Sequence, residues 1–101
     1  MGMMQTVKLI EKLAEILKEK PERILRDAIK SFVELQLQKI RAEKMSLTAK
    51  YSGYGVRSFR DLMSLVEKGI LSDVDIHDDL IRLDYLESRE KELTEFLRKL
   101  Q

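Results

Sequence analysis

One uninterrupted stretch of the chain constrains its fold more than any other feature. Between Pro21 and Gly53 there is no glycine and no further proline, and apolar residues recur at helical spacing. Pro21 suits the first turn of a helix, and about thirty residues at 1.5 Å each give a helix of roughly 45 Å. A compact chain of this size has a radius of gyration of about 13 Å. We therefore predict a long central helix over residues 21–51 that extends beyond a globular monomer.

The other segments also have helical spacing. A first helix is predicted from about residue 5 to residue 18. The glycine-containing segment 52–57 is predicted as a loop, and a short helix capped by Ser58 follows it and stops at Gly69. A last helix begins near residue 72 and continues to the C-terminus. The expected fold is all-α, with four helices, no sheet and a single domain over residues 1–101.

Composition excludes several classes of protein. The chain has no cysteine, so disulfide scaffolds, thiol nucleophiles and thiolate metal sites are excluded, and a reducing cytoplasm is the expected location. We expect neither a membrane span nor a signal peptide, because no apolar run approaches roughly 18 residues. The formal net charge is +1, but basic side chains are in excess in residues 1–50 and acidic ones in residues 71–101. Such asymmetry has two interpretations: one end meets nucleic acid and the other a different partner, or both are simply solvated helix faces.

The single histidine, His77, stands among aspartates. The spacing of these aspartates lacks the central glycine and closing glutamate of an EF-hand, and zinc prefers more nitrogen ligands. Acidic side chains at the start of a helix complement its dipole instead. No phosphate-binding loop or nucleophile elbow accompanies His77. We therefore predict no metal, no other cofactor and no enzymatic activity. The aspartates concerned are Asp73, Asp75, Asp78 and Asp79.

Two parts of the chain resemble known families. Residues 6–9, followed by 10–17 and 20–34, resemble ribbon-helix-helix regulators, in which a short strand, a helix, a polar turn and a second helix follow one another. Residues 49–62, followed by a glycine, an acidic segment and a closing amphipathic helix, resemble a group of small archaeal helical proteins. Those proteins are usually regarded as antitoxins of type II toxin–antitoxin pairs.

The ribbon-helix-helix resemblance implies contact with DNA. In that family the N-terminal strands of two chains pair and enter the major groove, which would make Thr6 and Lys8 the residues that face the bases. The apolar period of Val7, Ile10 and Leu13 instead continues a helical face into the same segment. Periodicity favours a helix over residues 5–10, and a helix there would remove the ribbon.

The antitoxin resemblance implies a binding module that neutralises a partner toxin of the ribonuclease type. The length of the central helix, whose apolar residues need cover, separately predicts a homodimer with its core in the helical hairpin of residues 1–51. Residues 52–101 would supply a loop, a short helix and an acidic helix that docks on the toxin. The competing interpretations are a helical oligomeric scaffold and a stand-alone DNA-binding regulator. The predicted dimer core is Leu25, Ile29, Phe32 and Val33. The predicted partner-binding residues are Asp75, Asp78, Asp79, Leu83 and Leu86.

The leucine stripe of the last helix leaves two alternatives open. It includes Leu80, Leu83 and Leu86 and continues to Leu100. A stripe left exposed would be a binding face, whereas a stripe folded back against the rear of the long helix would belong to the core.

Overall fold

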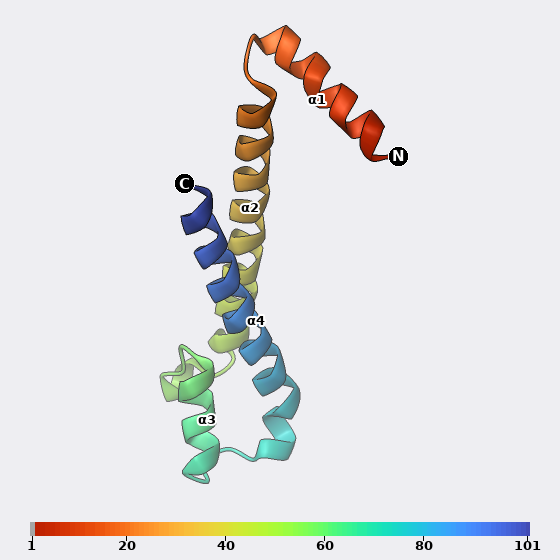
Figure 1. Cartoon of the computed structure of the whole chain (residues 1–101). Helices are drawn as coiled ribbons and strands as arrows, with labels where there is room; N and C mark the ends of the chain where they lie inside the picture. Colours follow the sequence, from red (N-terminus) through yellow and green to blue (C-terminus); the bar gives the residue numbers. More distant parts are fainter. Residues whose placement is uncertain (1) are drawn as a thin grey trace.

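The computed structural model describes residues 2–101 and shows an extended all-α chain (Figure 1). Its principal extents are 62 × 26 × 19 Å, and its radius of gyration is 19.9 Å. The predicted four-helix fold, with long second and last helices, is confirmed. The helices are α1 (Met3–Leu17), α2 (Pro21–Ala49), α3 (Phe59–Glu67) and α4 (Asp73–Leu100), with a 3-10 turn η1 (Ser52–Tyr54) between α2 and α3.

The strand implied by the ribbon-helix-helix resemblance is wrong for residues 5–10. These residues lie in α1, and the backbone N–H of Thr6 donates to the carbonyl of Gly2 at 3.3 Å in the first turn. Thr6 and Lys8 are therefore exposed residues of a helix and cannot form a paired ribbon. The physical reason is the helical apolar period, which turns Ile10 and Ala14 toward the rest of the chain.

α1 ends in a tight turn at Lys18. This residue has a φ of 55°, and its N–H donates to the carbonyl of Glu15 at 3.4 Å. The N–H of Glu19 donates to the carbonyl of Ala14 at 3.0 Å, which completes a Schellman arrangement. Pro21 then starts α2, where its missing N–H has no cost. The two helices consequently meet at an open angle, and α1 extends away from the rest of the molecule (Figure 1).

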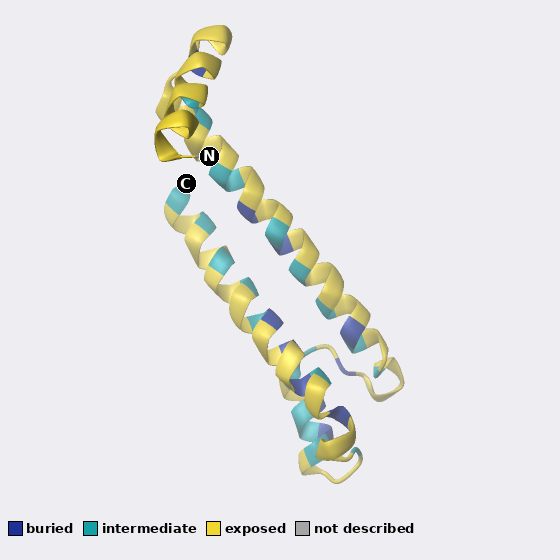
Figure 2. Cartoon of the chain, turned by 90° about the vertical axis from the view of Figure 1, so that its right-hand side faces the viewer, coloured by how far each residue is buried: buried dark blue, intermediate teal, exposed yellow. Residues whose placement is uncertain are grey.

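α4 runs antiparallel to α2 (Figures 1 and 2). The guanidinium of Arg26 donates to the carbonyl of Leu100 at one end of the pair, at 2.8 Å, and Tyr51 meets Asp79 at the other. The α2 residues that face α4 recur every three or four positions, which is coiled-coil spacing. We call these residues the inner seam; they are Val33, Leu37, Ile40, Lys44 and Leu47.

One polar layer interrupts the inner seam. Lys44 Nζ lies 3.4 Å from Glu87 Oε2 and 3.6 Å from Glu90 Oε1. Arg41 Nε donates to Glu90 at 2.8 Å, and this hydrogen bond holds the pKa of Glu90 below its usual value. Glu87 also accepts the N–H of Phe59, the first residue of α3, at 2.8 Å. The layer therefore joins α2, α3 and α4, and such polar positions set the register of a helix pair.

A second polar contact between α2 and α4 lies at the surface. Arg82 donates to both carboxylate oxygens of Glu43, and its guanidinium lies 5.1 Å from the centre of the Tyr85 ring. Arg89 approaches the same ring at 5.1 Å. Exposed ion pairs contribute little to stability, so we expect this contact to add little to the free energy of unfolding.

The main core lies at the end of the molecule away from α1. Here α3 packs against α4, and Leu62 of α3 is fully buried. Ser58 Oγ accepts the N–H of Asp61 at 3.2 Å, as predicted for the cap of α3. Gly69, at a φ of 74°, ends α3 with the Schellman bonds expected after a helix. Both caps confirm the sequence interpretation of this segment.

Leu83 and Leu86 belong to this core. Their exposed fractions are 0% and 1%, so the prediction that they form an exposed partner-binding face is wrong. The stripe of α4 folds back on its own chain, which was the second of the two alternatives. Apolar burial explains this outcome, because burying one leucine side chain stabilises the folded state by about 2 kcal/mol. No helix within residues 2–101 combines the length and apolarity needed to cross a bilayer.

We predict that Leu83→Ala lowers the free energy of unfolding by about 2–5 kcal/mol, because it leaves a cavity in a closely packed core. Ile81→Ala is the matched control, since Ile81 lies on the same helix and is 57% exposed. The control should change the free energy by less than about 0.5 kcal/mol. Urea denaturation followed by circular dichroism measures both. Equal effects of the two substitutions would contradict the packing of α4.

Candidate interaction surfaces

A second apolar seam on α2 lies largely exposed in the part of the chain that the structure describes. Leu25, Ala28, Phe32 and Leu35 recur at the same three-and-four spacing as the inner seam, roughly two fifths of a turn away. Phe32 is 63% exposed, Leu25 is 46% exposed and Leu35 is 47% exposed. We call these four residues the outer seam. They form an apolar face of α2 that α4 does not cover.

α1 adds further exposed apolar side chains. Ala14 is its buried residue and Ile10 is half-buried, so this side of the helix faces inward. The next side of α1 carries Leu9, Leu13 and Ile16, which are 56%, 42% and 68% exposed. Figure 2 shows α1 almost entirely exposed. α1 thus contacts its own chain along one narrow strip only.

A groove of about 290 Å³ lies where α1 meets α2. Val7, Ile10 and Glu11 line it from α1. Pro21, Glu22 and Leu25 line it from α2, so it joins one side of α1 to Leu25 at the start of the outer seam. We call the whole region the N-terminal apolar surface. It comprises the outer seam together with Val7, Leu9, Leu13 and Ile16 of α1.

The predicted dimer core divides between the two seams. Leu25 and Phe32 belong to the outer seam, whereas Val33 is 6% exposed and belongs to the inner seam. Ile29 is half-buried between them. Val33 is thus already covered by its own chain, and the shared dimer core of these four residues stays a prediction. The apolar residues of α1 were missed, although their helical period was visible in the sequence.

The opposite end of the molecule is acidic. Asp75 and Asp78 are exposed near the start of α4, and Val74 beside them is 85% exposed. His77 Nδ1 lies 4.0 Å from Asp73 one turn earlier. In the part of the chain that the structure describes, no three His, Cys, Asp or Glu side chains are arranged to hold a metal ion. The exposed carboxylates form a charged face at the helix start, which the helix dipole favours.

Asp79 differs from the other aspartates because it is tied to the chain. It accepts a hydrogen bond from the Tyr51 hydroxyl, and Lys50 Nζ lies 3.4 Å from its other oxygen. Burial and this bond to Asp79 raise the pKa of Tyr51 to about 12. Asp79 therefore joins the end of α2 to the start of α4. Of the predicted partner-binding residues, Asp75 and Asp78 remain freely exposed.

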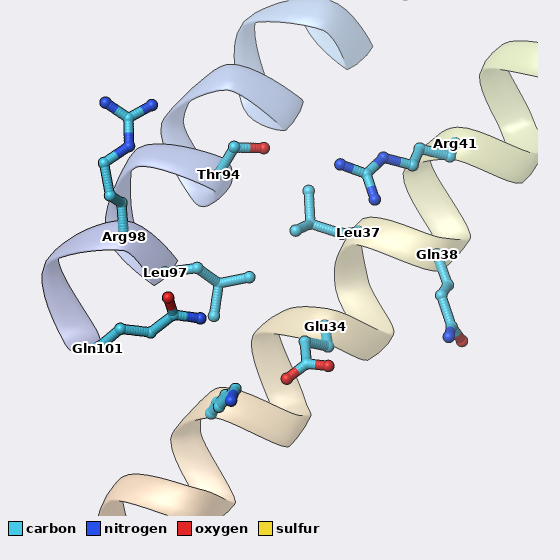
Figure 3. Close-up of a pocket in the computed structure, with 9 residues that line it drawn as sticks. Glu34, Leu37, Gln38, Arg41, Thr94, Leu97, Arg98 and Gln101 are labelled. Carbon is cyan, nitrogen blue, oxygen red and sulfur yellow. The ribbon is translucent and has the colours of Figure 1, made fainter.

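A third region is a groove of about 550 Å³ between the middle of α2 and the end of α4 (Figure 3). Leu37 and Leu97 point toward each other across it. Its rim carries charges of both signs, including Glu34 and Arg98, and Arg41 already binds Glu90. An apolar floor with a mixed charged rim is the ordinary surface of a helix pair. We therefore place the candidate interaction sites at the two ends of the molecule.

The chain belongs to a family described as the uncharacterized protein MJ0235 family, whose sequence profile matches residues 3–101. No curated protein and no solved structure matches the chain significantly. The match covers all four helices, so both ends of the molecule lie within the family's own domain.

We predict that Tyr51 ionises near pH 12, because its hydroxyl must keep its proton to donate to Asp79. The pKa of an ordinary tyrosine is about 10. The folded-state pKa is raised, so the stability from this bond is complete below about pH 10 and is lost as the pH rises toward about 12. Tyrosinate absorbance measures the ionisation.

Tyr51→Phe should remove the late component of that titration, and the matched control Tyr54→Phe should leave it in place. Tyr54 suits this purpose because it lies in η1 and is 52% exposed. If Tyr51→Phe instead removes a component of the titration near pH 10, where an ordinary tyrosine ionises, the result would contradict the bond to Asp79.

Proposed function

We propose that the protein is a non-enzymatic binding module that associates through its N-terminal apolar surface. The observation that supports this is the outer seam, which has coiled-coil spacing and lies exposed on a chain whose main core is complete elsewhere. Contiguous apolar patches on a soluble surface usually mark interaction sites. A helix face with this spacing accepts an amphipathic helix of a partner.

Direct DNA recognition has less support than protein binding. Lys8 and Lys12 on the polar side of α1 alternate with Glu11 and Glu15, so this helix offers phosphate no net positive face. Affinity for DNA depends mainly on neutralising phosphates with lysine and arginine. The ribbon that would present Thr6 is replaced by α1. A role as a stand-alone DNA-binding regulator is therefore not the function that we propose.

We predict that Phe32→Glu abolishes association, because it places a charge in the middle of the apolar outer seam. Native mass spectrometry measures association of the protein alone and after co-expression with the product of the adjacent reading frame. Met45→Glu is the matched control, since Met45 is 73% exposed on α2 and lies outside both seams. The control should associate as the wild type does. A wild-type chain that stays single in both preparations would contradict the proposal.

A second function is favoured by the acidic end. The exposed carboxylates of Asp75 and Asp78 and the exposed Val74 could dock on a basic surface, such as the active site of an RNA-cleaving toxin. The antitoxin hypothesis then needs only the exposed acidic residues, and the buried Leu83 and Leu86 take no part in the contact. The binding face would be smaller than first predicted, and its affinity would depend more on charge and therefore on salt.

We predict that the double substitution Asp75→Asn and Asp78→Asn weakens binding to such a partner by tenfold or more, because removing rim charges slows association. The matched control is Glu11→Gln with Glu15→Gln, which removes two negative charges from the other end of the molecule. Titration calorimetry against the co-expressed partner, at low and at physiological salt, measures the loss. Equal losses of affinity in the two double variants would show that binding depends on the net charge of the protein and not on the position of Asp75 and Asp78.

A further inference from the structure

The surface area of the chain is too large for a compact monomer. The chain exposes 7921 Å², whereas a typical monomer of this mass exposes about 5,900 Å². The excess is therefore about 2,000 Å² per chain. Burying that excess on two chains removes about 4,000 Å² in total, which lies within the roughly 2,000–5,000 Å² that obligate homodimers bury. The excess area per chain is thus of the size that a homodimer interface would bury.

We propose that the N-terminal apolar surface is closed by the same surface of a second copy of this chain. α1 and the first half of α2 from each copy would form a four-helix assembly about a two-fold axis. Such an isologous contact needs one surface that complements itself, and an apolar seam beside an apolar helix meets this condition. The inference rests on the proposed function, and it names the occupant of that binding surface.

The lengths of the two helical partners agree. The outer seam from Leu25 to Leu35 rises about 15 Å, and the fifteen residues of α1 rise about 22 Å. After Leu35 the same seam positions carry Lys39, Ala42 and Ser46, so its large apolar side chains end there. A helix of the length of α1 can therefore cover the outer seam, and the rear of α2 and all of α3 stay outside the contact.

Charge favours a second copy over a lipid surface. Membrane-surface helices carry an excess of lysine and arginine on the polar face. On α1, Lys8 and Lys12 are balanced by Glu11 and Glu15, which gives anionic lipid little to attract. The chain as a whole has a formal net charge of +1, so two copies approach each other without strong repulsion.

Sedimentation equilibrium of the purified full chain tests the proposal. The wild type and Met45→Glu should have twice the 11.9 kDa mass of one chain at micromolar concentration, and Phe32→Glu should have the single mass with unchanged helical circular dichroism. Hydrogen exchange gives a second measurement. Amides of α1 should be protected in the wild type and exchange at least tenfold faster in Phe32→Glu, while those around Leu83 keep their protection.

Two results would overturn the second-copy proposal: a wild-type mass of 11.9 kDa, or a Phe32→Glu variant that remains double. If the single wild-type chain also floats with phosphatidylglycerol vesicles, the surface binds lipid instead. If the single wild-type chain still binds the co-expressed neighbour, and Phe32→Glu abolishes that binding, the surface serves another protein. In that case the proposed function stands and the second copy is rejected.

Discussion

The polar layer of Lys44, Glu87 and Glu90 determines how the rest of the chain is arranged. A seam of leucines alone can pack in several alignments, whereas Lys44 meets both carboxylates in a single one. That alignment also brings Glu87 to the first N–H of α3, which positions α3 against α4. The layer thus decides which face of α2 is covered. Together with the burial of the leucines of α4, it places α4 on the inner seam, and the outer seam stays largely exposed.

The helices and their ends could be predicted from the sequence because their signals are local. Pro21 marks the start of α2, Ser58 caps α3, and Gly69 supplies the positive φ that ends it. Lys18 carried no such signal. Its side chain is unusual at a φ of 55°, so the Schellman turn that separates α1 from α2 could not be read from its residue type. The proline that follows was the only indication of a boundary.

The binding surfaces were harder to predict because periodicity shows that a face is apolar without showing what covers it. Leu83 and Leu25 look alike in the sequence, yet α2 and α3 enclose Leu83, whereas Leu25 stays 46% exposed. One available signal was the offset between two heptad series on α2. The series through Val33 contains Lys44, a charged residue that pairs with a carboxylate of α4. The series through Phe32 has only apolar residues from Leu25 to Leu35, so it offers α4 no charged partner there.

The distance between the two ends has a consequence for the proposed binding functions. α1 and the outer seam lie at one end of a molecule 62 Å long, and the start of α4, which carries Asp75 and Asp78, lies near the other (Figure 1). Screening limits the reach of surface charges to about 10 Å, so charge at one end hardly affects association at the other. The α2–α4 pair lies between the two ends. Closing the apolar end with a second copy would therefore leave both acidic ends open, and each assembly could hold two partner molecules independently.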